Sequence, residues 1–95
     1  MTAYVIMDID VKDPTTYKEY IGLAPATVEA YGGKYQARAG RTEKLEGDWV
    51  PKRLVILQFE SLERARAWLD SPEYQPIKRL RHAAAVSNIV AIEGV

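Results

Sequence analysis

Apolar and polar residues alternate along AYVIMDIDV (Ala3–Val11), a pattern typical of a strand with one buried face. Asp13 and Pro14 then favour a helix start, because the carboxylate can accept hydrogen bonds from the free amides of the first turn and proline has no amide to leave unpaired. Apolar residues recur at helical spacing up to the glycine pair at 32–33, which is expected to end the helix. Pro25 is expected to kink or split this helix just before it.

The rest of the chain predicts two strands, more helix and a last strand. Residues 34–39 (KYQARA) and 53–59 (RLVILQF) have strand patterns and are joined by a long excursion. Ser61 can cap a helix with an apolar stripe, a second helical piece starts near residue 71, and SNIVAIEGV closes the chain as a strand. The order strand, helix, strand, strand, helix, strand predicts an α+β fold, the ferredoxin-like βαββαβ motif with a four-stranded antiparallel sheet.

In this motif both helices cover one face of the sheet, and the other face stays open. Strict alternation predicts an apolar helix-facing side and a mixed open side with Tyr4, Ile6, Asp8, Lys34, Gln36, Arg38, Leu54, Ile56 and Gln58. The last strand can be assigned either way. The open side is too apolar for water and too polar for unpartnered burial. We therefore expect a homodimer through the open sheet face, in which two sheets form a dimeric α/β barrel with a partly polar lumen.

Composition narrows the classes of function. We expect residues 1–95 to form a single domain, small enough that a partner subunit would help to bury its core. Thirteen basic and thirteen acidic residues give zero net charge, which argues against nucleic-acid binding. The absence of cysteine excludes disulfides and thiolate chemistry. No apolar stretch approaches the length of about 20 residues that spans a bilayer, so we expect a cytoplasmic protein that does not enter membranes.

A ligand pocket is expected in the barrel lumen. The planar guanidinium of Arg38 is suited to hold a carboxylate or an enolate, and an enclosed void of about 300 Å³ or more beside it would favour a ligand. The expected ligand-binding residues are Arg38, Gln36, Gln58, Asp8, Tyr4 and Tyr20. The competing interpretation makes Arg38 a structural ion-pair partner of Asp8.

Catalytic candidates are few. His82 has a pKa suited to a general base, although its basic neighbours favour an exposed flank, and Asp8 is the other candidate. Asp8 and Asp10 share a strand face, but no histidine is near in sequence, and we expect no metal. Trp49 and Tyr74 are expected at the pocket mouth or in the dimer seam.

Several motifs resemble one family. YVIMDIDVKDPTTYKEY, YGGKYQARAG, WVPKRLVILQFES, AWLDSPEYQPIKRLR and the closing IVAIEGV are similar to the family of domain of unknown function 1330, within the dimeric α/β-barrel superfamily. The resemblance covers essentially the whole chain and implies a ferredoxin-like protomer that dimerises sheet to sheet. Relatives in the superfamily include monooxygenases and isomerases that often work without an organic cofactor, and we expect none here. A cofactor-free monooxygenase or isomerase and a non-catalytic structural or regulatory dimer with a filled barrel are the two hypotheses.

Overall fold

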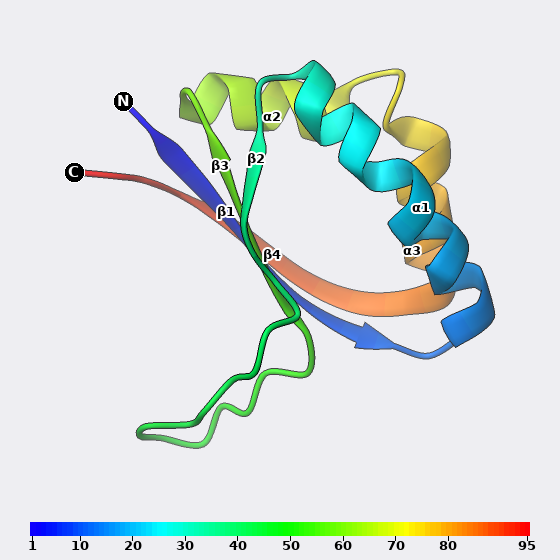
Figure 1. Cartoon of the computed structure of the whole chain (residues 1–95), viewed down its shortest axis with the longest axis vertical. Helices are drawn as coiled ribbons and strands as arrows, with labels where there is room; N and C mark the ends of the chain where they lie inside the picture. The colour runs from blue at the N-terminus through cyan, green and yellow to red at the C-terminus, as the bar shows by residue number, and fades with distance from the viewer.

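The protein is an antiparallel sheet covered on one face by helices (Figure 1). The computed structural model describes residues 1–95. The elements in chain order are β1 (Ala3–Val11), α1 (Pro14–Ala30), β2 (Lys34–Arg38), β3 (Leu54–Phe59), α2 (Leu62–Asp70), α3 (Gln75–Ala84) and β4 (Ala85–Glu93). The strand order is β2-β3-β1-β4. This arrangement confirms the predicted α+β, ferredoxin-like fold, with the second helical region divided into α2 and α3.

The sheet register assigns the faces of the strands. Val5 pairs with Leu57 of β3 and with Ala91 of β4, so these three residues point to the same, helix-covered side. Ile6 pairs with Ile56 and with Val90 on the open side. The face of the last strand, which alternation left undecided, is thereby settled, and its open-side residues are Val86, Asn88, Val90 and Ile92.

The core lies between the sheet and the helices. Its largest fully buried side chains are Trp68, Tyr74, Phe59, Met7, Ile9, Leu57 and Val28. The indole Nε1 of Trp68 donates to Thr27 Oγ1 at 3.1 Å, and the Thr27 hydroxyl donates to the Ala24 carbonyl at 2.7 Å, which satisfies the polar groups that α1 and α2 bury.

Of the two outcomes expected at Pro25, a kink or a split, the split does not occur. α1 runs unbroken from Pro14 to Ala30 with Pro25 inside it. Proline in a helix interior costs one hydrogen bond, but the buried residues on both sides of Pro25 keep the two halves packed on the same core. None of the helices has the length and apolarity needed to span a bilayer.

Residues 39–53 form an arm between β2 and β3 that has no regular secondary structure. In Figure 1 the arm projects from the sheet on the side away from the helices. Ala39 and Gly47 have φ angles of +55° and +91°, the left-handed conformation that turns a chain sharply. Connections of about 15 residues without secondary structure are uncommon in compact domains and often have a function.

Candidate functional site

A β-bulge in β2 determines where Arg38 points. Tyr35 pairs with Leu57, but the next pairs are Ala37 with Ile56 and Arg38 with Val55, so Gln36 is an extra residue without a partner in β3. Because Val55 is buried under the helices, Arg38 emerges on the helix-covered side. The predicted position of Arg38 on the open face is therefore wrong. Strict alternation does not count the extra residue and therefore assigns Arg38 to the wrong face of the sheet.

On the helix-covered side Arg38 belongs to a group of tyrosines and arginines, which we call the Tyr–Arg site. Its members are Tyr17, Tyr20, Tyr35, Arg38 and Arg53, from α1, β2 and the last residue of the arm, directly before β3. They line a cavity of about 20 Å³, with room for about one water molecule. The cavity is far below the volume that would favour an enclosed ligand, so any larger molecule has to bind at the exposed mouth.

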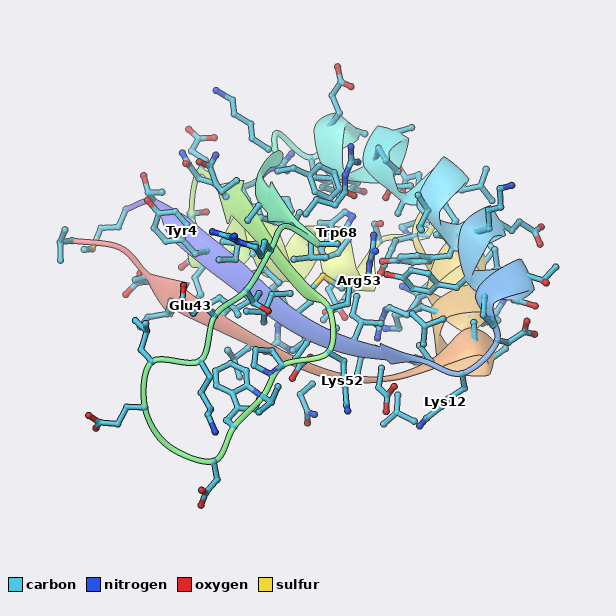
Figure 2. The ribbon with its side chains drawn as sticks, turned by 60° about the horizontal axis from the view of Figure 1, so that its bottom comes forward. Tyr4, Lys12, Glu43, Lys52, Arg53 and Trp68 are labelled. Carbon is cyan, nitrogen blue, oxygen red and sulfur yellow. The ribbon has the colours of Figure 1, made fainter.

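At the mouth, each arginine lies on a tyrosine. The guanidinium carbon of Arg38 is 4.6 Å from the centre of the Tyr35 ring, and that of Arg53 is 5.3 Å from the Tyr17 ring. Arg53 Nε also donates to the Tyr17 hydroxyl at 3.1 Å. Figure 2 shows Arg53 and Trp68 in the layer between the sheet and the helices. Cation–π contact fixes the guanidinium planes and leaves N–H groups at their edges for another partner.

Behind the mouth lies a buried polar network. The hydroxyl oxygens of Tyr20 and Tyr74 are 2.8 Å apart, and Arg81 Nε donates to the Tyr74 hydroxyl at 3.3 Å. Arg81 is only 4% exposed, and Tyr74 is fully buried. The predicted position of Tyr74 at the pocket mouth or the dimer seam is therefore wrong, because the helical layer encloses it.

No carboxylate neutralises these arginines. The chain has a single salt bridge, between Lys12 and Asp10, away from the Tyr–Arg site. Burial raises the pKa of Tyr17, Tyr20 and Tyr35, and for Tyr20 the neighbouring Tyr74 raises the pKa further. The tyrosines therefore remain neutral phenols at ordinary pH, and the site has an uncompensated positive charge. Such a site can attract and orient an anion.

Asp8 lies on the other side of the sheet and has a different role. Its Oδ2 accepts a hydrogen bond from Trp49 Nε1 and its Oδ1 accepts one from the Lys52 amide, both at 2.9 Å. Burial acts to raise the pKa of Asp8, but these bonds, the Arg53 amide and the Lys52 charge together hold it below the usual range. The predicted ion pair between Asp8 and Arg38 does not form, because the sheet separates them. Both oxygens of Asp8 are thus already engaged by the arm.

The structure divides the other predicted site residues between the two faces. Tyr4 and Gln58 are cross-strand neighbours on the open side, while Gln36 is the exposed bulge residue. Tyr20 is the one further residue that joins Arg38 on the helix-covered side. His82 is exposed on α3, where partial burial and the charges of Arg81 and Lys78 lower its pKa.

Sequence reasoning did not single out four residues of the Tyr–Arg site and the network behind it: Tyr17, Tyr35, Arg53 and Arg81. Signals existed for two of them. Arg53 directly precedes β3 and alternates with Val55 and Leu57, and Arg81 follows Ile77 by one helical turn on the apolar stripe of α3. Neither signal reveals which partners the arginine meets.

A second hollow lies on the helix-covered side, between α2 and strands β1 and β4. It is an open groove of about 590 Å³ lined mainly by apolar residues, among them Val5, Ala65, Leu69 and Ile89, with Glu63 and Arg66 at the α2 side. Trp68 lines both this groove and the small cavity of the Tyr–Arg site.

Fold and register place the chain among ferredoxin-like α+β proteins. The sequence matches the model of the family described as "Domain of unknown function (DUF1330)" over residues 2–95, and the chain belongs to this family. The resemblance noted from the motifs is thus confirmed. No curated protein matches the sequence.

The solved structures that are similar to the chain include the following three. RPA0582 from Rhodopseudomonas palustris, a protein of unknown function, has a TM-score of 0.77 at 17% identity, covering 99% of this chain and 82% of that one. A dimeric ferredoxin-like protein of unknown function from Jannaschia has a TM-score of 0.68 at 12% identity, with coverage of 99% and 100%. SnoaB from Streptomyces nogalater, a cofactor-independent oxygenase, has a TM-score of 0.67 at 14% identity, with coverage of 99% and 92%. At these identities the likeness establishes the fold alone.

Proposed function

We propose that the chain binds a small organic anion at the mouth of the Tyr–Arg site. The observation that carries the proposal is the pair Arg38 and Arg53, two cations on tyrosine rings with no carboxylate beside them. Arg53 lies two residues before Val55, the partner of Arg38, so the two arginines are diagonal cross-strand neighbours within reach of one ligand. A planar carboxylate or enolate matches the donor edge of a guanidinium in two hydrogen bonds.

The buried part of the site supports an anion further. Arg81 adds a third positive charge in a region of low polarisability, where charges act over longer distances than in water. The neutral phenols of Tyr17 and Tyr20 supply hydroxyl groups but no opposing charge. The open face has no comparable group of cations, so we assign the ligand to the helix-covered side rather than to a barrel lumen.

For the bound anion we propose a reaction that needs no cofactor. It is either a monooxygenation, in which the substrate itself supplies the two electrons that reduce the second oxygen atom to water, or an isomerisation. The fold shared with SnoaB supports this class as an analogy. The alternative is a dimeric structural or regulatory module without chemistry, and the small volume of the cavity, about 20 Å³, favours it. Oxygen uptake and product analysis with a panel of phenolic and enolic acids separate these cases. A monooxygenase consumes oxygen, an isomerase converts the acid without consuming oxygen, and a non-catalytic module does neither.

Binding is tested with salicylate, a planar hydroxy acid, by isothermal titration calorimetry. Replacing Arg38 with alanine removes a charge-assisted contact worth about 1.5–3 kcal/mol, so affinity should fall roughly 10- to 150-fold. Lys34→Ala is the matched control, because Lys34 lies on the same strand but pairs with Gln58 on the open side, and it should change affinity less than about threefold.

Three results would count against the site. Salicylate and related acids that fail to bind the wild-type chain at millimolar concentration would exclude an anion site of this type. Normal binding by Arg38→Ala, or a larger loss in Lys34→Ala, would place the ligand elsewhere. Unfolding of Arg38→Ala before ligand is added would make the arginine structural, although its single cation–π contact predicts a loss of only about 1 kcal/mol.

We also propose that the chain forms a homodimer through its open sheet face. Val86, Val90 and Ile92 are exposed there beside Tyr4 and Ile6. A standard interface buries about 800 Å² per partner, roughly one eighth of the 6319 Å² surface of this chain. The Jannaschia protein of the same fold is dimeric, which supports the assignment. Sedimentation at micromolar concentration should give twice the chain mass, and a folded monomer would refute it.

A further inference from the structure

The arm, residues 39–53, is attached to the open face through one carboxylate. Asp8 lies in the middle of β1, paired with Leu54 on one side and Asn88 on the other. Each of its oxygens accepts a different hydrogen bond from the arm, one from the Trp49 indole and one from the Lys52 amide, both at 2.9 Å. The arm has no other side-chain hydrogen bond to the sheet. Asp8 is therefore the side chain that fixes the direction of the arm.

The arm presents apolar side chains that its own protomer does not cover. Leu45 is 89% exposed, Trp49 62% and Val50 59%. The backbone of the arm projects from the sheet on the side away from the helices (Figure 1). Trp49 lies on this open side, where it donates to Asp8, and the register puts the exposed β4 residues Val86 and Val90 on the same side. Exposed apolar residues that gather on one side mark an interaction surface.

We propose that Asp8 is a positioning residue that holds the arm in the conformation in which it packs against a second copy of this chain. The inference rests on the proposed dimer and adds to it the arm as part of the interface and Asp8 as its organiser. An isologous dimer suits this surface, because a two-fold axis places the arm of each protomer beside the open face of the other and covers both apolar groups.

A second copy fits better than a charged partner. The arm mixes both signs of charge, with three basic residues (Arg41, Lys44 and Lys52) and three acidic ones (Glu43, Glu46 and Asp48), while Arg53 at its end contacts Tyr17 on the helix-covered side. A surface of mixed charge has no net field to attract a nucleic acid or an acidic membrane, whereas it can complement itself across a two-fold axis. Because Asp8 already orders the arm in the free protomer, the arm loses less conformational entropy when the dimer forms.

The test compares Asp8→Asn with Asp10→Asn. Asp8→Asn keeps the size of the side chain but removes its charge, and one of the two terminal atoms no longer accepts hydrogen bonds. Asp10 lies on the same face of the same strand, and its contact is the 2.9 Å salt bridge to Lys12 rather than the arm. Trp49→Phe removes one of the two donors and keeps an aromatic ring, so it tests the same attachment from the arm side and does not alter the sheet.

Two readouts are measured for all variants: the dimer dissociation constant by sedimentation, and the rate of trypsin cleavage after Arg41, Lys44 and Lys52. For Asp8→Asn we expect the dissociation constant to rise about tenfold or more and the arm to be cut faster in dilute protein. Trp49→Phe should change both in the same direction by a smaller factor, and Asp10→Asn should behave as wild type.

The outcomes separate this inference from the proposed dimer. If the wild type dimerises and Asp8→Asn dimerises equally well, the dimer stands and the role of Asp8 is refuted. If Asp10→Asn weakens the dimer as much as Asp8→Asn does, a general loss of negative charge on β1 explains the effect, and the attachment of the arm does not. If the wild type is a monomer at all concentrations, the dimer and the role of the arm both fail. If Asp8→Asn does not fold, Trp49→Phe alone decides, and an unchanged dissociation constant refutes the inference.

Discussion

The buried polar network depends on the hydroxyl group of Tyr74. It accepts a hydrogen bond from Arg81 Nε at 3.3 Å and lies 2.8 Å from the Tyr20 hydroxyl. Replacing it with phenylalanine keeps the ring packed on Trp68, 4.3 Å away between ring centres, and removes only the oxygen. Tyr74→Phe therefore isolates the polar contribution of the network from that of the core.

The expected cost follows from the two bonds. A hydrogen bond between neutral groups contributes about 0.5–1.5 kcal/mol, and one that involves a charged group about 1.5–3 kcal/mol. The bond from Arg81 is long, so its contribution should lie at the low end of that range. We expect Tyr74→Phe to lower the free energy of unfolding by about 2–3 kcal/mol. For a domain of this size that corresponds to a fall in Tm of roughly 10–20 °C.

Urea denaturation followed by circular dichroism measures the change. Tyr4→Phe is the control, because Tyr4 is only half-buried, lies on the open face and makes no side-chain hydrogen bond within the chain, so its loss should stay within about 0.5 kcal/mol. A double-mutant cycle with Arg81→Met should give a coupling energy of about 1 kcal/mol or more. A loss for Tyr74→Phe no larger than that for Tyr4→Phe would refute the network.

Three further predictions concern the fold. Gly33→Ala should lower the free energy of unfolding by about 1–3 kcal/mol, because an added Cβ would lie 2.7 Å from Phe59 Cε1. Gly22 has open space around it inside α1, so Gly22→Ala should raise the free energy of unfolding by about 0.5–1 kcal/mol, and thermal melts compare the two variants. Burial, together with Tyr74, raises the pKa of Tyr20, so above about pH 10 the unfolded chain loses this proton while the folded chain keeps it, and the free energy of unfolding should fall. Tyr20→Phe should make this fall less steep, as measured by urea titrations from about pH 9 to 11. Deleting Gln36 should leave the chain folded, since the bulge residue has no partner in β3, and loss of the fold would contradict the register.

Local signals predicted most of the architecture. The alternation in Ala3–Val11 and the strand-like run before Phe59 have the bounds expected within a residue or so. The capping residues also behave as predicted, with Asp13 accepting from the Thr16 amide at 3.3 Å and Ser61 from the Arg64 amide at 3.1 Å. These features depend on neighbours within a few residues, which the sequence displays directly.

The site was harder to predict because one residue changes its geometry. In KYQARA, alternation puts Lys34 and Arg38 on one face of the strand. In the structure Gln36 forms a bulge, so Lys34 and Arg38 point to opposite faces. Nothing in the residue types of this short, exposed edge strand marks the bulge. The attachment of the arm has the same limitation, since Asp8 and Trp49 are 41 residues apart and only the tertiary fold brings them together.

The placement of charge is the strongest argument that the Tyr–Arg site has a function. Thirteen acidic residues balance thirteen basic ones over the chain, so composition does not explain why no carboxylate pairs with Arg38, Arg53 or Arg81. A buried guanidinium is costly, and apolar residues of similar size often serve stability as well or better. Arg81 nevertheless occupies a core position, and its Nε donates to the Tyr74 hydroxyl. It lies behind Arg38 and Arg53, each of which lies on a tyrosine ring at the open mouth. An arrangement that gives up stability to concentrate positive charge is expected where an anion binds.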